Sequence, residues 1–204
     1  MSRLPDPLFL ADSRGLDFLN SIATPYDEVI EWLGTGNDLL AWSIAAGFVP
    51  AADAKTVRKN AAPGELDAVA SEARALRERF RAFVVAHKGK QLRARTLSEL
   101  APLNRILARD EQYGEIQVSH LGNPSMQFVA RRRWRTPQAL LAPIASAIAE
   151  VICNEDFRTI KACPGHNCTL FFVDRTRGST RRWCTMAICG NRAEQAAHRK
   201  RAAS

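Results

Sequence analysis

Four of the five cysteines lie close together in two pairs of identical spacing, Cys163-x4-Cys168 and Cys184-x4-Cys189. Thiolate sulfur is a preferred zinc ligand, and structural zinc sites are closed and tetrahedral, so four cysteines complete one site. We therefore predict that these residues hold one structural Zn²⁺. Two other interpretations are four ordinary buried or redox-active cysteines, and replacement of one cysteine ligand by His166.

Local turns must bring each cysteine pair together, because residues five apart on an α-helix point about 140° away from each other. Pro164-Gly165 supplies a turn signal within the first pair. For the second pair we favour Thr185 as the cap of a helix that has Cys189 in its first turn. The alternative cap is Asn191, with Glu194 three residues later in a capping-box pattern. The sequence leaves this boundary open.

The segment between the two pairs predicts a β-hairpin. An apolar run, residues 169–173, is followed by the polar stretch 174–180 and then by residues 181–183. The order of knuckle, hairpin, second ligand pair and helix is that of a treble-clef finger. So small a unit would depend on zinc, whose binding contributes roughly 10–16 kcal/mol in finger peptides. Cys153 precedes this unit and is expected to be a small core residue and not a fifth ligand.

The positive charge is concentrated at the C-terminal end. The chain has a formal net charge of +8, and residues 175–204 carry eight of the basic residues and one acid, Glu194, which leaves about +1 for the rest. Such asymmetry is typical of a polyanion-binding end, and double-stranded DNA is the partner that we expect. The predicted nucleic-acid-binding residues are Arg175, Arg177, Arg181, Arg182, Arg192, Arg199, Lys200 and Arg201. A solvated basic tail, an RNA-binding surface or a protein-interaction module remain as alternatives.

The chain before the finger predicts a mainly helical domain with one hairpin, so the protein as a whole is expected to be α+β. Apolar residues at three- and four-residue steps predict a helix over 65–87, and another is expected over 7–22. Alternating residues in 115–120 and 126–134 predict two strands joined by Gly122-Asn123-Pro124. We place the helical domain at 1–155 and the finger at 160–204.

A small-molecule site is a further possibility in the helical domain. Asp17 and Asn20 are one helical turn apart and could lie near Trp42, and a few polar groups among apolar ones can orient a ligand. Helix capping or a satisfied buried hydrogen bond would explain the same residues.

Catalysis and membrane insertion are not expected. The four histidines are scattered, Gly34-Thr35-Gly36 lacks the remainder of a phosphate loop, and a closed four-cysteine site leaves no position for water. No segment approaches the roughly 20 uninterrupted apolar residues of a membrane helix, and residues 1–6 hold no apolar signal-peptide run. We predict a soluble cytoplasmic protein that is not an enzyme.

Two segments resemble known families. Residues 181–192, RRWCTMAICGNR, together with Cys163-Pro164 and residues 171–174, FFVD, resemble the CGNR zinc finger. Residues 16–20, LDFLN, with Asp38-Leu39 and Trp42, resemble the ABATE domain that usually precedes it. The resemblance implies zinc on the four paired cysteines and a role as a stress-induced bacterial transcription regulator that binds DNA. Glu194 departs from the basic residue typical of the helix after the Asn-Arg pair, which puts DNA contact by that helix face in doubt.

Overall fold

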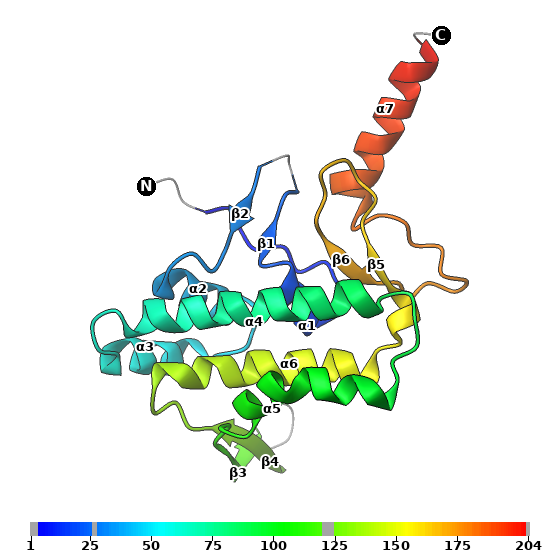
Figure 1. The fold of residues 1–204 in the computed structure, drawn as a ribbon. Coiled ribbons are helices and arrows are strands. Elements are labelled where there is room, and N and C mark those ends of the chain that lie inside the picture. The colour runs from blue at the N-terminus through cyan, green and yellow to red at the C-terminus, as the bar shows by residue number, and fades with distance from the viewer. Residues whose placement is uncertain (1–3, 26–27, 120–124, 203–204) are drawn as a thin grey trace.

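The computed structural model describes residues 4–25, 28–119 and 125–202. A bundle of helices forms the body, and a smaller C-terminal unit lies against one side of it (Figure 1). The predicted α+β class, with a helical N-terminal part and a small zinc finger, is confirmed. The helices of the body are α1 (Arg14–Leu19), α2 (Gly36–Ala45), α3 (Ala51–Asn60), α4 (Glu65–His87), α5 (Ala101–Leu107) and α6 (Leu141–Asn154).

Helices α4 and α6 form the centre of the core. The α4 bounds are those predicted from the apolar repeat, and the residues of that repeat, such as Val69, Ala73 and Phe80, are buried. Helix α1 packs closely on α6, because a Cβ on Gly15 would lie 2.5 Å from the carbonyl oxygen of Ala147. A glycine is therefore needed at this crossing.

The first helix is shorter than predicted. We expected residues 7–22 to be helical, but α1 begins only after Ser13 and ends at Leu19. Asp12 has a φ of 56°, in the left-handed region, and this breaks the chain direction before the helix. The preceding residues run extended and, as described below, contact the C-terminal unit. The apolar composition of these residues suggested a helix and did not indicate that they contact the C-terminal unit.

The chain enters α2 and α6 in different ways. Thr35 caps α2, with its hydroxyl accepting from the Asp38 N–H and the Asp38 carboxylate accepting from the Thr35 N–H. Thr136 precedes a 3-10 turn, Pro137–Leu140, which leads into α6, and its side chain makes no capping hydrogen bond. Residues 137–154 are long and apolar enough to span a membrane by length and composition alone, but just over half of the segment is buried inside this protein, as in a core helix.

The described strands form two-stranded antiparallel sheets. β1 (Ile22–Ala23) pairs with β2 (Ile30–Glu31), and β3 (Gln112–Ser119) pairs with β4 (Ser125–Arg132), each antiparallel. The β3–β4 hairpin was predicted; its turn at 122–124 lies outside the described residues. 3-10 helices cover Ala94–Leu100 and Phe157–Thr159.

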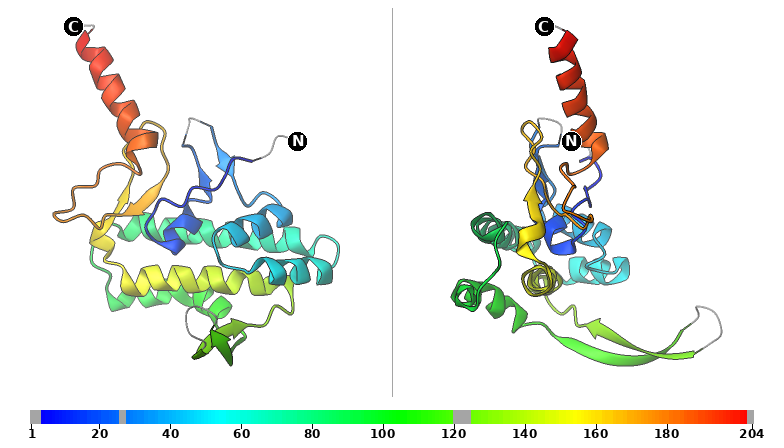
Figure 2. Two further views of the ribbon diagram at one scale, coloured as in Figure 1. Left: turned by 180° about the vertical axis from the view of Figure 1, so that it is seen from behind. Right: turned by 90° about the vertical axis from the view of Figure 1, so that its right-hand side faces the viewer.

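The hairpin of the C-terminal unit is not the one predicted. β6 (Phe171–Val173) pairs antiparallel with β5 (Ile160–Ala162), which precedes the first cysteine pair, whereas residues 181–183 form no strand. The turn between β5 and β6 is therefore the knuckle itself. A long loop leads from β6 to a π-helical turn, Met186–Gly190, and to α7 (Asn191–Ala202), which projects away from the body (Figures 1 and 2).

Candidate metal centre and the surrounding finger

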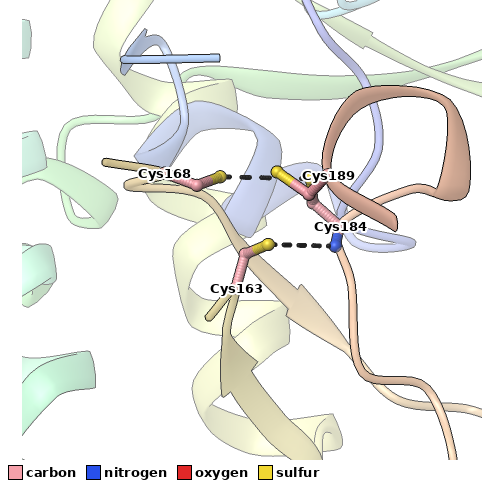
Figure 3. A group of neighbouring side chains, drawn as sticks. All are labelled: Cys163, Cys168, Cys184 and Cys189. Carbon is pink, nitrogen blue, oxygen red and sulfur yellow. Dashed lines mark hydrogen bonds between the residues drawn. The ribbon is translucent and has the colours of Figure 1, made fainter. Parts of the chain in front are cut away.

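The four paired cysteines meet at one point. Their Sγ atoms all lie within 4.8 Å of one another, and those of Cys168 and Cys184 are 4.0 Å apart (Figure 3). With Zn–S bonds of about 2.3 Å, a tetrahedral site requires sulfurs about 3.8 Å apart. Cys163, Cys184 and Cys189 are buried and Cys168 is partly buried, so an ion bound here is shielded from solvent.

Short turns on two elements position these sulfurs. In the knuckle, the Cys163 N–H donates to the Leu170 carbonyl, closing the β5–β6 end, and the Cys168 N–H donates to the Gly165 carbonyl. A Cβ on Gly165 would lie 2.6 Å from the Cys189 Sγ, so the glycine makes room for the ligand cluster. The sequence suggested Gly165 only as a turn residue, because this contact joins segments that are far apart in the chain.

The second pair is set by the turn before α7. The Thr185 hydroxyl accepts from the Ile188 N–H, and the Thr185 carbonyl accepts from the N–H groups of Cys189 and Gly190. Thr185 is therefore the cap, as favoured from the sequence, and α7 proper begins at Asn191. The wide turn places Cys189 back over Cys184, which a regular α-helix could not do at this spacing.

The electrostatics of the cluster call for a cation. Hydrogen bonds from the Cys168 and Cys184 thiols, with the Cys184 N–H 3.3 Å from the Cys163 Sγ, lower the pKa of Cys163 to about 2. Burial, together with the neighbouring sulfurs, raises the pKa of Cys189 to about 12, and hydrogen bonding to Cys163 and Cys168 raises that of Cys184. Four thiolates cannot share this volume unless a bound cation offsets their charge. Zn²⁺ fits the donor set, the spacing and the burial.

The remaining candidate ligands lie outside the cluster. The ligand group found among the described residues contains the four paired cysteines and neither His166 nor Cys153. Cys153 is exposed on α6, so the expectation of a small core residue was wrong. His166 is an exposed residue of the knuckle.

Comparison with known protein families agrees with this geometry. The ABATE family model, described as "Putative stress-induced transcription regulator", matches residues 12–155, and the CGNR zinc finger model matches residues 159–202. The chain belongs to the ABATE family. It carries a CGNR zinc finger that binds one zinc ion through Cys163, Cys168, Cys184 and Cys189. The comparison with curated proteins finds no match.

The CGNR finger is fastened to the ABATE part through β6. The Asn20 side chain bonds both backbone groups of Phe171: its Nδ2 donates to the carbonyl at 2.8 Å and its Oδ1 accepts from the N–H at 2.9 Å. The Val173 N–H donates to the Ala11 carbonyl. The residues before α1 thus act as a partner for the outer edge of β6.

These contacts account for the three predicted ligand-binding residues without a ligand. Asn20 is 2% exposed and satisfied by Phe171, and the Asp17 carboxylate accepts from the Ala11 N–H at 3.0 Å. Trp42 is buried within 6.1 Å, centroid to centroid, of three phenylalanine rings. The alternative interpretation, satisfied buried groups, describes them better than a small-molecule site.

Two of the predicted nucleic-acid-binding arginines serve the same interface. All five N–H donors of Arg181 have acceptors, namely Asp12 and the carbonyls of Leu10, Val173, Trp183 and Cys184. Its guanidinium also lies 4.2 Å from the Phe172 ring centroid. Arg175 donates to the Asp12 carbonyl and to Glu155. Arg181 in particular is a structural residue, and the prediction of a nucleic-acid contact for it needs correction.

A buried carboxylate holds the loop that carries these arginines. Burial opposes ionisation of Asp174, but hydrogen bonds from Lys161 and from the Thr176 hydroxyl and N–H hold its pKa at about 2. Lys161 also donates to the carbonyls of Ser179 and Arg181. No sequence pattern predicted this network, because a polar loop residue is usually solvated.

The other predicted cations lie on the outer side of the finger. Arg192 and Arg199 line one side of a cleft of about 350 Å³ that the knuckle residues Pro164–His166 and Trp183 close on the other side. Arg192 also donates to the Pro25 carbonyl at 3.2 Å. Arg177 and Arg182 are exposed on the loop, with Arg182 stacked 4.8 Å from the Trp183 ring centroid. Arg201 is exposed near the end of α7, and Lys200 lies in the same helix.

Proposed function

We propose that this protein is a cytoplasmic DNA-binding transcription regulator of the stress response, in which zinc holds the cationic face of the finger rigid. The observation that carries the proposal is the cleft between the knuckle and α7. Arg192 and Arg199 are seven residues apart, almost two helical turns, and therefore face the same way. Gln195, on the same side, adds a group that can donate and accept hydrogen bonds.

The charge on α7 is distributed to suit a phosphate backbone. By the 100° step of a helix, Glu194 lies about 160° away from Arg192 and about 140° away from Arg199 around the helix axis. Its carboxylate is exposed and is not among the cleft residues. The doubt that Glu194 raised for DNA binding by this helix therefore does not apply to the cleft face.

A binding function is favoured over an enzymatic one. A zinc ion held by four thiolates has no open coordination position for water or substrate, so its role is structural. The finger contributes a rigid scaffold of knuckle, loop and helix instead. Non-enzymatic DNA binding agrees with the family description.

The test is binding of the zinc-loaded protein to a random duplex at several salt concentrations. Replacing Arg192 and Arg199 by alanine should weaken binding about tenfold or more and reduce the slope of log K against log[salt] by about 2, one unit per lost phosphate contact. The matched control replaces Arg58 and Lys59 by alanine, exposed cations of α3 that lie away from the finger. The control removes the same charge and should leave the slope unchanged.

Other outcomes would select the alternatives. Equal losses in the two double variants would show that only net charge matters and would remove the cleft from the proposal. Preference for single strands would favour RNA. Absence of binding by protein with one bound zinc would favour a protein-interaction module.

A further inference from the structure

A groove lies in the helical body between α4 and α5, on the side away from the one from which α7 projects (Figures 1 and 2). This α4–α5 groove consists of two adjoining hollows of about 300 Å³ and about 390 Å³, whose walls share Glu72, Ile106, Arg109 and Leu141. Hollows of this size are typical of small-molecule sites. All of the lining residues belong to the helical body, so the groove is separate from the cleft of the finger.

Arginine is the main polar residue of the groove. The two hollows are lined by six arginines and three acidic residues, a formal excess of +3. The arginines are Arg79, Arg105, Arg109, Arg132, Arg133 and Arg135. Two of the acids are already paired, Asp110 with Arg132 and Glu111 with Arg135. Within the described part of the chain the other four arginines have no acidic partner, so their mutual repulsion favours a bound anion.

Arg132 is held in a fixed orientation at one end of the groove. Its Nε and Nη2 donate to the two carboxylate oxygens of Asp110 at 2.5 Å and 2.8 Å, and its side chain is 15% exposed. The same bonds lower the pKa of Asp110. The guanidinium also lies 5.7 Å from the ring centroid of Trp134. Because a guanidinium has five N–H donors and these bonds use two, a ligand meets further donors that are already oriented.

Apolar side chains adjoin these cations. Ile106 and Leu141 line both hollows, Ala139 and Ala142 line the first, and Leu76 lines the second. A phosphate backbone alone would gain nothing from this surface. Cationic and apolar surface side by side suit a molecule that has an anionic group on an apolar body.

We propose that the α4–α5 groove binds a small organic anion that carries two negative charges, as a phosphate or as two carboxylates, on an apolar body. The planar guanidinium fork matches the oxygen pairs of either group. The apolar lining takes the body of the molecule. Nucleic acid is disfavoured as the occupant, because the groove faces away from α7 and a duplex in the cleft of the finger does not reach it (Figure 1).

The test is isothermal titration calorimetry of nuclease-treated, zinc-loaded full-length protein at low salt and about pH 8, where a phosphate monoester carries about two charges. The probes are phenyl phosphate, phthalate and inorganic phosphate. Phenyl phosphate and phthalate distinguish a phosphate site from a dicarboxylate site. The preferred one of these two should bind once per chain and more tightly than inorganic phosphate, which has no apolar body.

Variants of the groove should change this binding in opposite directions. Arg105→Ala combined with Arg109→Ala should weaken it about tenfold or more, because charge-assisted hydrogen bonds are lost. Glu72→Gln should strengthen it about threefold, the effect of removing one like charge roughly 6 Å away in water. The matched control is Arg93→Ala combined with Arg95→Ala, because these exposed arginines precede α5 and line neither hollow. The control should bind as the wild type does, and circular dichroism identifies any variant that has not folded.

The cleft of the finger provides the comparison that keeps this inference apart from the proposed function. Arg192→Ala combined with Arg199→Ala should keep the binding of the anion, and the Arg105 and Arg109 double variant should keep the binding of a duplex. Anion binding that is lost in the finger variant and kept in the groove variant would place the anion on the finger and overturn the proposal. Loss of duplex binding in the groove variant would assign the groove to nucleic acid and overturn it too. Wild-type protein that binds none of the three probes, or equal binding by the groove variant and its control, would also contradict it.

Discussion

At the scale of single residues, Gly165 shows how tightly the zinc site is built. Its missing Cβ leaves the space that the Cys189 Sγ occupies, 2.6 Å from the position of such an atom, and the Cys168 Cβ is 3.3 Å away. Gly165→Ala should therefore displace a ligand and destabilise the zinc-loaded finger by roughly 1–3 kcal/mol, the usual cost of overpacking. Competition with a chromogenic chelator measures the change in zinc affinity.

The control for this variant is His166→Ala in the same turn. His166 is exposed and outside the ligand group, so one zinc per chain should remain with nearly unchanged affinity. A loss of zinc from His166→Ala, or none from Gly165→Ala, would contradict the assignment of four cysteine ligands packed around a glycine.

A second prediction for a single residue is that Asp17 makes the folding stability depend on pH. Burial raises its pKa to about 6, despite the hydrogen bond from the Ala11 N–H. In the unfolded chain its pKa is about 3.9. Between these values the folded state binds a proton that the unfolded state releases, so this group favours folding as pH falls from about 6 to about 4. At neutral pH the charged, part-buried carboxylate costs about 1–2 kcal/mol, allowing for the water that still reaches it.

Asp17→Asn keeps an oxygen that can accept from Ala11 but removes the charge. It should raise the free energy of unfolding at about pH 7 by that amount and make no difference near pH 4. Urea unfolding of both proteins with excess zinc, compared at the same pH, isolates the effect from titration of the cysteines. A constant difference across the pH range would contradict the prediction.

At the scale of elements, Arg181 and Arg182 form a natural matched pair. They are neighbours with the same charge, but all five donors of Arg181 are used, two of them on Asp12 and Leu10 before α1 and three within the finger. Arg182 is instead exposed and stacks on Trp183. Arg181→Ala should lower the melting temperature by several degrees, because it leaves buried carbonyls unsatisfied. Arg182→Ala should leave the melting temperature within about a degree and weaken duplex binding instead.

Thermal unfolding and anisotropy of the two variants give these results directly. Equal losses of melting temperature in the two variants would show that the hydrogen bonds of Arg181 do not account for its contribution to stability. Unchanged duplex binding by Arg182→Ala would remove the loop from the proposed nucleic-acid surface.

Local signals in the sequence predicted local structure well. The apolar repeat of residues 65–87 gave α4, and the cysteine spacing gave the ligands, because both depend on residues near in the chain. The strand partner of Phe171–Val173 was predicted to follow it in the chain, but β5 precedes it. Asn20 was predicted to bind a small molecule, but it bonds Phe171. Both errors concern β6, whose neighbours are β5 on one edge and the chain before α1 on the other. The contact between Asn20 and Phe171 spans 151 residues and leaves no periodicity to read, and β5 has three residues, too few to show an alternating pattern.

At the scale of the whole molecule, zinc is expected to stabilise more than the finger. β6 is held between β5 and the residues before α1, and the Asn20–Phe171 bonds and the Val173–Ala11 bond lie directly beyond the knuckle. If the cysteines separate, the knuckle that joins β5 to β6 opens, and these bonds lose their geometry. Arg181, which donates to the Cys184 carbonyl and to the Leu10 carbonyl, transmits the same change.

Removal of zinc with a strong chelator should therefore loosen part of the helical body as well as unfold the finger. Hydrogen exchange should accelerate in the finger and also in the segment from Leu10 to Ser21, while α4 keeps its protection, because its core contacts with α6 do not involve the finger. Re-addition of zinc should restore the slow exchange. Protection of residues 10–21 that is unaffected by the chelator would mean that the two parts are folded independently. The finger and the helical body would then be joined without being coupled, and a structural change in one could not reach the other through β6.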